Sequence, residues 1–147
     1  MRPDHRRGQR RKSGKPKPLL GALAATLVIA APAALADPAV DWAKAQRVDL
    51  VEVDYAFQPS QLTFRRDRAY QLHVENHGRE LHELTAPDFF KAVELRDTGV
   101  LNQDRTELVL QPGDQKDLYF VPLQPGRYDM RCADHDWAGM TGDITVD

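Results

Sequence analysis

The chain has 147 residues, a formal net charge of −2 and 29% charged residues. A chain of this length has room for one domain and little more. Its single cysteine excludes an internal disulfide.

Residues 1–36 differ in character from the rest of the chain. They hold eight of the 20 Lys and Arg residues and one of the 22 Asp and Glu residues, followed by an apolar run over residues 19–31 and then Ala34-Leu35-Ala36. This order is typical of a secretory signal peptide, so we expect export to the periplasm, cleavage after Ala36 and no membrane insertion afterwards. The alternative is an uncleaved anchor, although residues 19–35 fall short of the roughly 20 residues of a spanning helix. Two arginine pairs near the start leave the export route open.

Without residues 1–36 the chain is acidic. Residues 37–147 carry 12 basic and 21 acidic side chains, a formal balance of −9. This charge argues against a nucleic-acid partner, because binding phosphates needs a basic face. It suits a positively charged protein partner, and it equally suits solubility alone.

Residues 37–47 are predicted to form a short lead-in, and residues 48–147 one domain of short strands. From Arg47 the hydrophobic pattern has a period of two, with Val51, Val53, Tyr55 and Phe57 on one side and Glu52 and Asp54 on the other. Turn residues separate further predicted strands at residues 62–64, 70–74, 107–110, 116–121, 127–132 and 143–146. His73 is expected to point outward into solvent.

Residues 85–103 are the least regular part of the domain. A short helix is expected just after Pro87, with Phe89 and Phe90 closing one edge of the core. Seven or eight short strands with little helix predict an all-β fold, an antiparallel β-sandwich with a helix or loop insertion near residues 87–103.

The only cysteine begins a Cys-x2-His-x4-Met sequence made of Cys132, His135 and Met140. A thiolate, an imidazole and a thioether select copper over magnesium or calcium, and two histidines, one cysteine and a weak axial methionine describe a blue-copper electron-transfer site. Zinc fits less well, since the sequence lacks four Cys and His ligands at finger-like spacing. The second histidine must come from elsewhere in the chain. His82 is the best candidate, and His77 is the alternative.

Residues 128–146 resemble the copper-binding end of the cupredoxin family, and the Cys-x2-His-x4-Met spacing is that of plastocyanin-like members. Upstream, Asn76-x-Gly78-x3-His82 resembles the loop that carries the family's first histidine. The likeness covers about residues 48 to 147. It implies a Greek-key β-sandwich that holds one type 1 copper ion, cycling between Cu(I) and Cu(II), between two loops at one end.

By the same resemblance, His82, Cys132 and His135 form a trigonal plane around the copper, and Met140 is the axial ligand. The implied function is that of a monomeric one-electron carrier. It would take an electron through an exposed His135 from a partner such as a c-type cytochrome and pass it to a membrane oxidase or reductase. We do not expect an enzyme, because reductases and oxidases of this fold need further copper centres, and only His73 and His77 remain as ligands in residues 37–147. Met130 is expected to pack in the core.

Glu83 departs from the family pattern, in which electron carriers usually have an asparagine that ties the two ligand loops together. A carboxylate there would favour Cu(II) and lower the reduction potential, or it would form a salt bridge to Arg79 or Arg131. Acidic residues also flank His135, at Asp134 and Asp136. These features favour an alternative function, copper delivery or sequestration.

Trp137 lies in the same loop as His135. Cupredoxins present an apolar patch around the exposed ligand histidine. Trp137 is therefore expected either to dock a partner or to keep water from the metal.

Overall fold

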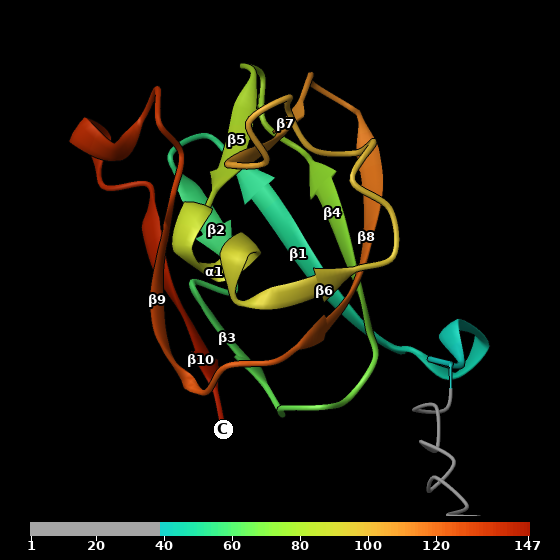
Figure 1. The fold of residues 1–147 in the computed structure, drawn as a ribbon. Coiled ribbons are helices and arrows are strands. Elements are labelled where there is room, and N and C mark those ends of the chain that lie inside the picture. Colours follow the sequence, from blue (N-terminus) through green and yellow to red (C-terminus); the bar gives the residue numbers. More distant parts are fainter. Residues whose placement is uncertain (1–38) are drawn as a thin grey trace, which may run out of the picture. The chain divides into compact units, whose positions relative to one another are not determined.

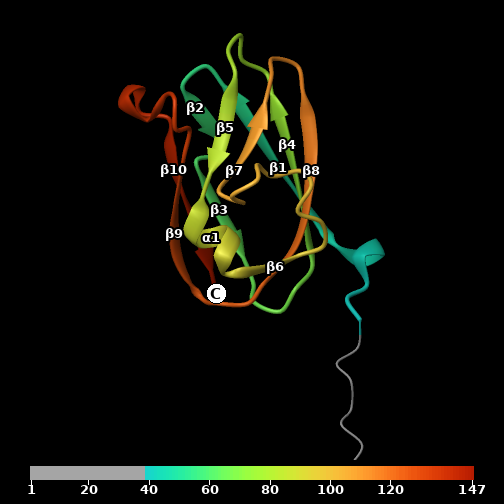
Figure 2. The ribbon, with the colours of Figure 1, turned by 45° about the horizontal axis from the view of Figure 1, so that its top comes forward.

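The computed structural model describes residues 39–147, which form two β-sheets packed face to face (Figures 1 and 2). The predicted signal peptide and the first two residues of the lead-in lie outside the described residues. In chain order the elements are the 3-10 helix η1 (Trp42–Lys44), β1 (Gln46–Val53), β2 (Ala56–Gln58), β3 (Gln61–Phe64), β4 (Tyr70–Asn76), β5 (His82–Thr85), α1 (Pro87–Lys91), β6 (Val93–Leu95), β7 (Glu107–Leu110), β8 (Gln115–Pro122), β9 (Gly126–Arg131), the 3-10 helix η2 (Asp136–Ala138) and β10 (Thr141–Val146).

One sheet has the strand order β2-β1-β4-β8-β6 and the other β3-β10-β9-β5-β7. The predicted all-β sandwich is confirmed. The described residues form ten strands where seven or eight were expected, and the pairs β1 with β4 and β3 with β10 are parallel. Parallel neighbours need a crossover connection. The chain makes one between β1 and β4 by visiting the second sheet as β3.

The helix expected after Pro87 is α1, which has a proline in its first turn, where the missing N–H costs nothing. Its residues Phe89 and Phe90 are buried as expected. The chain then continues as β6, a strand that the sequence analysis missed and that pairs with β8. Within residues 39–147, no helix is both long and apolar enough to cross a membrane.

Four aromatic rings form the centre of the core. The ring of Phe64 lies 4.8 Å from that of Tyr70, 5.8 Å from that of Phe89 and 5.0 Å from that of Phe120, measured between centroids. All four side chains are buried, and burying a large apolar side chain contributes about 1.5–3 kcal/mol. The strand registers place Phe64, Tyr70 and Phe120 toward the end of the sandwich opposite the β4–β5 and β9–β10 connections.

The predicted facing of β1 is wrong. Leu50 and Glu52 point inward and are fully buried, whereas Val51 and Val53 are only partly buried. The prediction treated residues 47–57 as one strand, but the chain turns after Val53. The returning strand β2 places Phe57 directly opposite Glu52, so both side chains share the inner face.

The prediction that His73 is a solvated surface residue is also wrong. It does lie on the outer face of its sheet, but only 7% of the residue is exposed. Its Nδ1 atom lies 2.7 Å from Oδ1 of Asp117 on β8, and its Nε2 atom lies 2.9 Å from Oε1 of Glu75. Side chains from its own strand and the neighbouring strand therefore cover the ring.

Candidate metal centre

The four predicted ligands come from two loop regions at one end of the sandwich (Figure 1). His82 opens β5, just after the loop that leaves β4. Cys132 directly follows β9, and Met140 directly precedes β10. His135 lies in the loop between them, beside η2.

Backbone hydrogen bonds fold this second loop back on itself. The N–H of Cys132 donates to the carbonyl of Met140 at 3.0 Å, and the N–H of His135 donates to the carbonyl of Cys132 at 3.2 Å. The helix η2 ends at Gly139, whose φ of 91° lies in the left-handed region that glycine adopts without strain. Short-range geometry thus brings Cys132, His135 and Met140 together.

His82, Cys132 and His135 present one nitrogen or sulfur atom each, and these three atoms lie within 4.8 Å of one another. The Sγ atom of Cys132 is 3.4 Å from Nδ1 of His135 and 3.9 Å from Nδ1 of His82. When an ion binds three ligand atoms in one plane at about 2.0–2.3 Å, neighbouring ligand atoms lie roughly 3.5–4 Å apart. The donor set and its spacing fit one soft metal ion. His77 lies outside this cluster, with its Nε2 atom 2.6 Å from Oε2 of Glu75.

The candidate ligands are shielded from solvent. His82, Cys132 and Met140 have no exposed surface. The expected exposure of His135 is wrong, because only 12% of its side chain is exposed. The ring of Tyr55 covers it, with 5.1 Å between the centroids.

Burial raises the pKa of the Cys132 thiol. Three backbone N–H groups, from Glu83, Asp134 and His135, point at the sulfur and oppose this shift. They would stabilise the thiolate that a bound metal requires.

Three residues beside the histidines escaped the sequence analysis as site residues. Asp54 and Tyr55 form the turn between β1 and β2, and Glu80 lies in the loop between β4 and β5. A hydrogen bond from the backbone N–H of Arg79 and, second in size, one from its guanidinium group lower the pKa of Asp54 to about 2. The sequence pattern assigned Asp54 and Tyr55 to one continuous strand and left Glu80 in a polar loop, so no signal identified them as site residues.

Of the two alternatives for Glu83, the salt bridge is not formed, because Arg79 pairs with Asp54 and Arg131 pairs with Asp136. Burial raises the pKa of the Glu83 carboxyl, and the charges of nearby acids add to the shift. The backbone N–H groups of residues 133 and 134 point at this carboxyl and partly oppose it. Glu83 therefore lies beside the loop that carries Cys132, and its Oε2 atom is buried without a hydrogen-bond partner.

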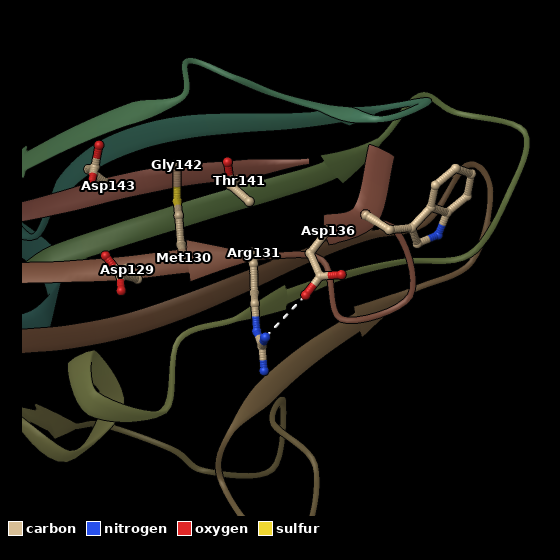
Figure 3. Close-up of a pocket in the computed structure, with 8 residues that line it drawn as sticks. Asp129, Met130, Arg131, Asp136, Thr141, Gly142 and Asp143 are labelled. Atoms are coloured by element: carbon tan, nitrogen blue, oxygen red, sulfur yellow. Dashed lines mark hydrogen bonds and ion pairs between the residues drawn. The ribbon is translucent and has the colours of Figure 1, made fainter. Parts of the chain in front are cut away.

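An open groove runs beside this loop over the outer face of β9 and β10 (Figure 3). At its end, the guanidinium group of Arg131 lies 3.1 Å from the carboxylate of Asp136 and anchors η2 to β9. Trp137, the next residue, is 78% exposed, and its indole N–H donates to the carbonyl of Asp134. None of the four candidate ligands lines the groove. The hydrogen bond to Asp134 orients the exposed indole of Trp137.

The sequence profile of the cupredoxin-like domain matches residues 19–146. The chain belongs to this family. The predicted resemblance to cupredoxins is therefore confirmed, and the His-Cys-His-Met cluster of this cupredoxin-like domain resembles a type 1 copper site. A search of curated protein sequences found no match.

Solved structures with the same fold include two auracyanins. One is the dithionite-reduced auracyanin of the photosynthetic bacterium Roseiflexus castenholzii, with 15% identity, a TM-score of 0.53, and coverage of 70% of this chain and 98% of that one. The other is auracyanin B, with 20% identity, a TM-score of 0.54, and coverage of 70% and 89%. At these identities the likeness is one of fold.

Proposed function

We propose that this cupredoxin-like domain binds one copper ion through His82, Cys132, His135 and Met140 and works as a one-electron carrier. The observation that carries the proposal is the convergence of two imidazole Nδ1 atoms on one buried thiol, within 4.8 Å. Bound copper would supply the one-electron couple Cu(II)/Cu(I). One relative by fold was solved in a chemically reduced state, which fits a redox role.

The protein's part in such a reaction is to keep the ligands in place. The ligand loops are closed by backbone hydrogen bonds and lie at one end of the two-sheet sandwich. Electron transfer is fast when a site changes little in shape between its oxidation states. The burial of three of the four ligands also excludes water, and the axial ligand and apolar surroundings tune the potential.

The proposed partner is a positively charged redox protein, such as a c-type cytochrome, or a membrane oxidase or reductase. It would dock over Trp137 and Tyr55, which are 78% and 40% exposed. The nearby acids Glu80, Asp134 and Asp136, together with the balance of −9 over residues 37–147, support a cationic partner. We further propose that the exported protein acts as a monomer in the periplasm.

The test is to add Cu(II) to the domain of residues 37–147 and record its visible absorption and paramagnetic-resonance spectra. An intense thiolate-to-copper band that disappears on reduction and returns on oxidation is the expected result. The variant Cys132→Ser should bind copper without this band. If the unaltered domain binds Cu(II) without the band, the carrier function is wrong.

Copper delivery or sequestration is the second candidate function. Three carboxylates, those of Asp54, Glu80 and Glu83, surround the ligand segments, and carboxylates favour Cu(II). A delivery protein should release its copper readily to a competing chelator or a partner apoprotein. Very slow release would count against this function and leave the carrier proposal standing.

A further inference from the structure

The two candidate ligand histidines, His82 and His135, share a second contact on the side of the ring away from Cys132. Each ring directs Nδ1 at the Cys132 sulfur and Nε2 at a carboxylate. The Nε2 atom of His82 lies 3.3 Å from Oδ1 of Asp54, and the Nε2 atom of His135 lies 2.9 Å from Oε2 of Glu80. Asp54 belongs to neither segment that carries the ligands, and Glu80 lies in the loop before His82 but faces His135 of the other segment.

Asp54 is held firmly in this position. The backbone N–H of Arg79 donates to its Oδ1 at 2.8 Å, and the guanidinium group donates to its Oδ2 at 3.1 Å. A side chain at Gly78 would place its Cβ 2.5 Å from Oδ1 of Asp54 and 2.6 Å from Nε2 of His82. The absence of a side chain at residue 78 is therefore what allows the carboxylate and the imidazole to meet.

Glu80 is also positioned by hydrogen bonds, one to its side chain and one to its backbone. The hydroxyl of Tyr55 donates to Oε2 at 3.4 Å, and the side-chain amide of Asn76 donates to the Glu80 carbonyl at 2.9 Å. The turn of Asp54 and Tyr55 therefore supports both histidines: it provides the acceptor for His82 and the ring that packs on His135. This turn acts as a third loop of the centre.

An ionised carboxylate only accepts hydrogen bonds, so each Nε2 atom must carry the hydrogen. This leaves the lone pair on Nδ1, which is the tautomer a metal at the Cys132 sulfur needs. A carboxylate bonded to the far nitrogen of a ligand histidine also makes the imidazole a stronger donor. A stronger donor, together with two nearby negative charges, favours Cu(II) over Cu(I).

We propose that Asp54 and Glu80 are positioning residues that hold His82 and His135 in the metal-binding tautomer and lower the reduction potential of the centre. The part that concerns the potential rests on the proposed copper function. The part that concerns the tautomer holds for the metal-free protein and can be tested without copper.

The tautomer is measured in the metal-free domain by nitrogen-15 NMR of the histidine rings at about pH 8, where an ordinary imidazole is neutral. In the unaltered protein both rings should carry the hydrogen on Nε2. In Asp54→Ala, His82 should become a mixture of tautomers while His135 stays unchanged, and Glu80→Ala should do the reverse. Unchanged tautomers in both variants would overturn the positioning role.

The potential is measured on the copper-loaded variants Asp54→Asn and Glu80→Gln, which keep an acceptor oxygen but lose the charge. The ratio of Cu(II) to Cu(I) affinity should fall roughly tenfold for each charge removed, which raises a one-electron potential by about 59 mV. The visible band should persist. Glu94→Gln is the matched control, since it removes the same charge from an exposed position on β6.

If both amide variants have the same potential as Glu94→Gln, the electronic part of the proposal is wrong. If the unaltered domain develops no thiolate band, the proposed function fails instead, and the tautomer measurement still decides the positioning role.

Discussion

The backbone N–H of Cys132 donates a hydrogen bond to the carbonyl oxygen of Met140, 3.0 Å away. This bond joins the two ends of the loop, so the sulfur of the cysteine and the buried thioether of the methionine are brought to the same end of the core. The thioether therefore has two potential roles, packing and ligation, and these can be separated.

Replacing Met140 by leucine tests them. Leucine conserves the volume of methionine, so the metal-free domain should lose less than about 1.5 kcal/mol of unfolding free energy in urea. The copper form should keep its visible band and gain a higher reduction potential, because the axial thioether that tunes the site is gone. Met130→Leu is the matched control, since Met130 is equally buried and lies in the core strand β9. A similar rise in potential in Met130→Leu would contradict ligation by Met140.

A methyl group at residue 78 should damage the centre selectively. The Cβ atom of Gly78→Ala would press on both Asp54 and His82 and force them apart. We expect a roughly tenfold or greater loss of Cu(II) affinity, with an overpacking cost of about 1–3 kcal/mol in the metal-free domain. Gly99→Ala is the control, because its Cβ would meet only the side chain of Asp97, at 3.2 Å. Equal copper affinity in the two variants, measured by competitive titration, would argue against the prediction.

The sequence predicts the candidate ligands better than their surroundings. Cys132, His135 and Met140 are close in the chain, so their spacing alone places them in one loop, and the resemblance adds His82. The acceptor of His82, Asp54, is separated from it by 28 positions. Its place depends on a tight turn between β1 and β2, and no local pattern distinguishes such a residue from a solvated one.

The errors in the predicted facing have one cause. Alternation assigns the residues of a strand to two faces but does not say which face is inside, nor what covers the outer one. At Glu52 the turn after Val53, which was not predicted, reversed the face that was assigned to the core. At His73 the neighbouring strand, which the alternation does not describe, buried the ring.

The buried His73 should make stability depend on pH. Both of its nitrogens face carboxylates, Asp117 on β8 and Glu75 on β4. Chiefly because of the hydrogen bond to Asp117, the pKa of His73 is raised above its usual 6.5, although burial and, less strongly, the charge of Arg47 oppose this. The bond stabilises the fold below the ordinary histidine pKa, and this contribution is lost as pH rises through the raised value. Asp117→Asn should therefore cost about 1.5–3 kcal/mol in urea unfolding at about pH 5.5 and clearly less at about pH 9. Asp49, opposite His73 on β1, is exposed, and Asp49→Asn should change little at either pH.

The buried Glu52 should make the fold less stable as pH rises, which is the opposite of the effect of an acid in a salt bridge. Neither of its carboxyl oxygens has a hydrogen-bond partner. Burial, followed by the charge of Glu83, raises its pKa from 4.5 to about 8. The folded state then holds a proton that the unfolded chain releases, so stability is greatest below the unfolded value of 4.5 and falls as pH rises toward about 8.

The size of this effect follows from the size of the pKa shift. Each pKa unit corresponds to about 1.36 kcal/mol, so ionising Glu52 in the folded state costs on the order of 5 kcal/mol. Glu52→Gln removes the titration and nearly conserves the side-chain volume. Urea unfolding of the metal-free domain between about pH 5 and 9 should show a flatter stability profile for Glu52→Gln than for the unaltered protein, with the variant gaining relative stability as pH rises. Glu94→Gln, which removes an exposed carboxyl, should run parallel to the unaltered protein. If Glu52→Gln also runs parallel, Glu52 is ionised at no cost in the folded state and its raised pKa is wrong.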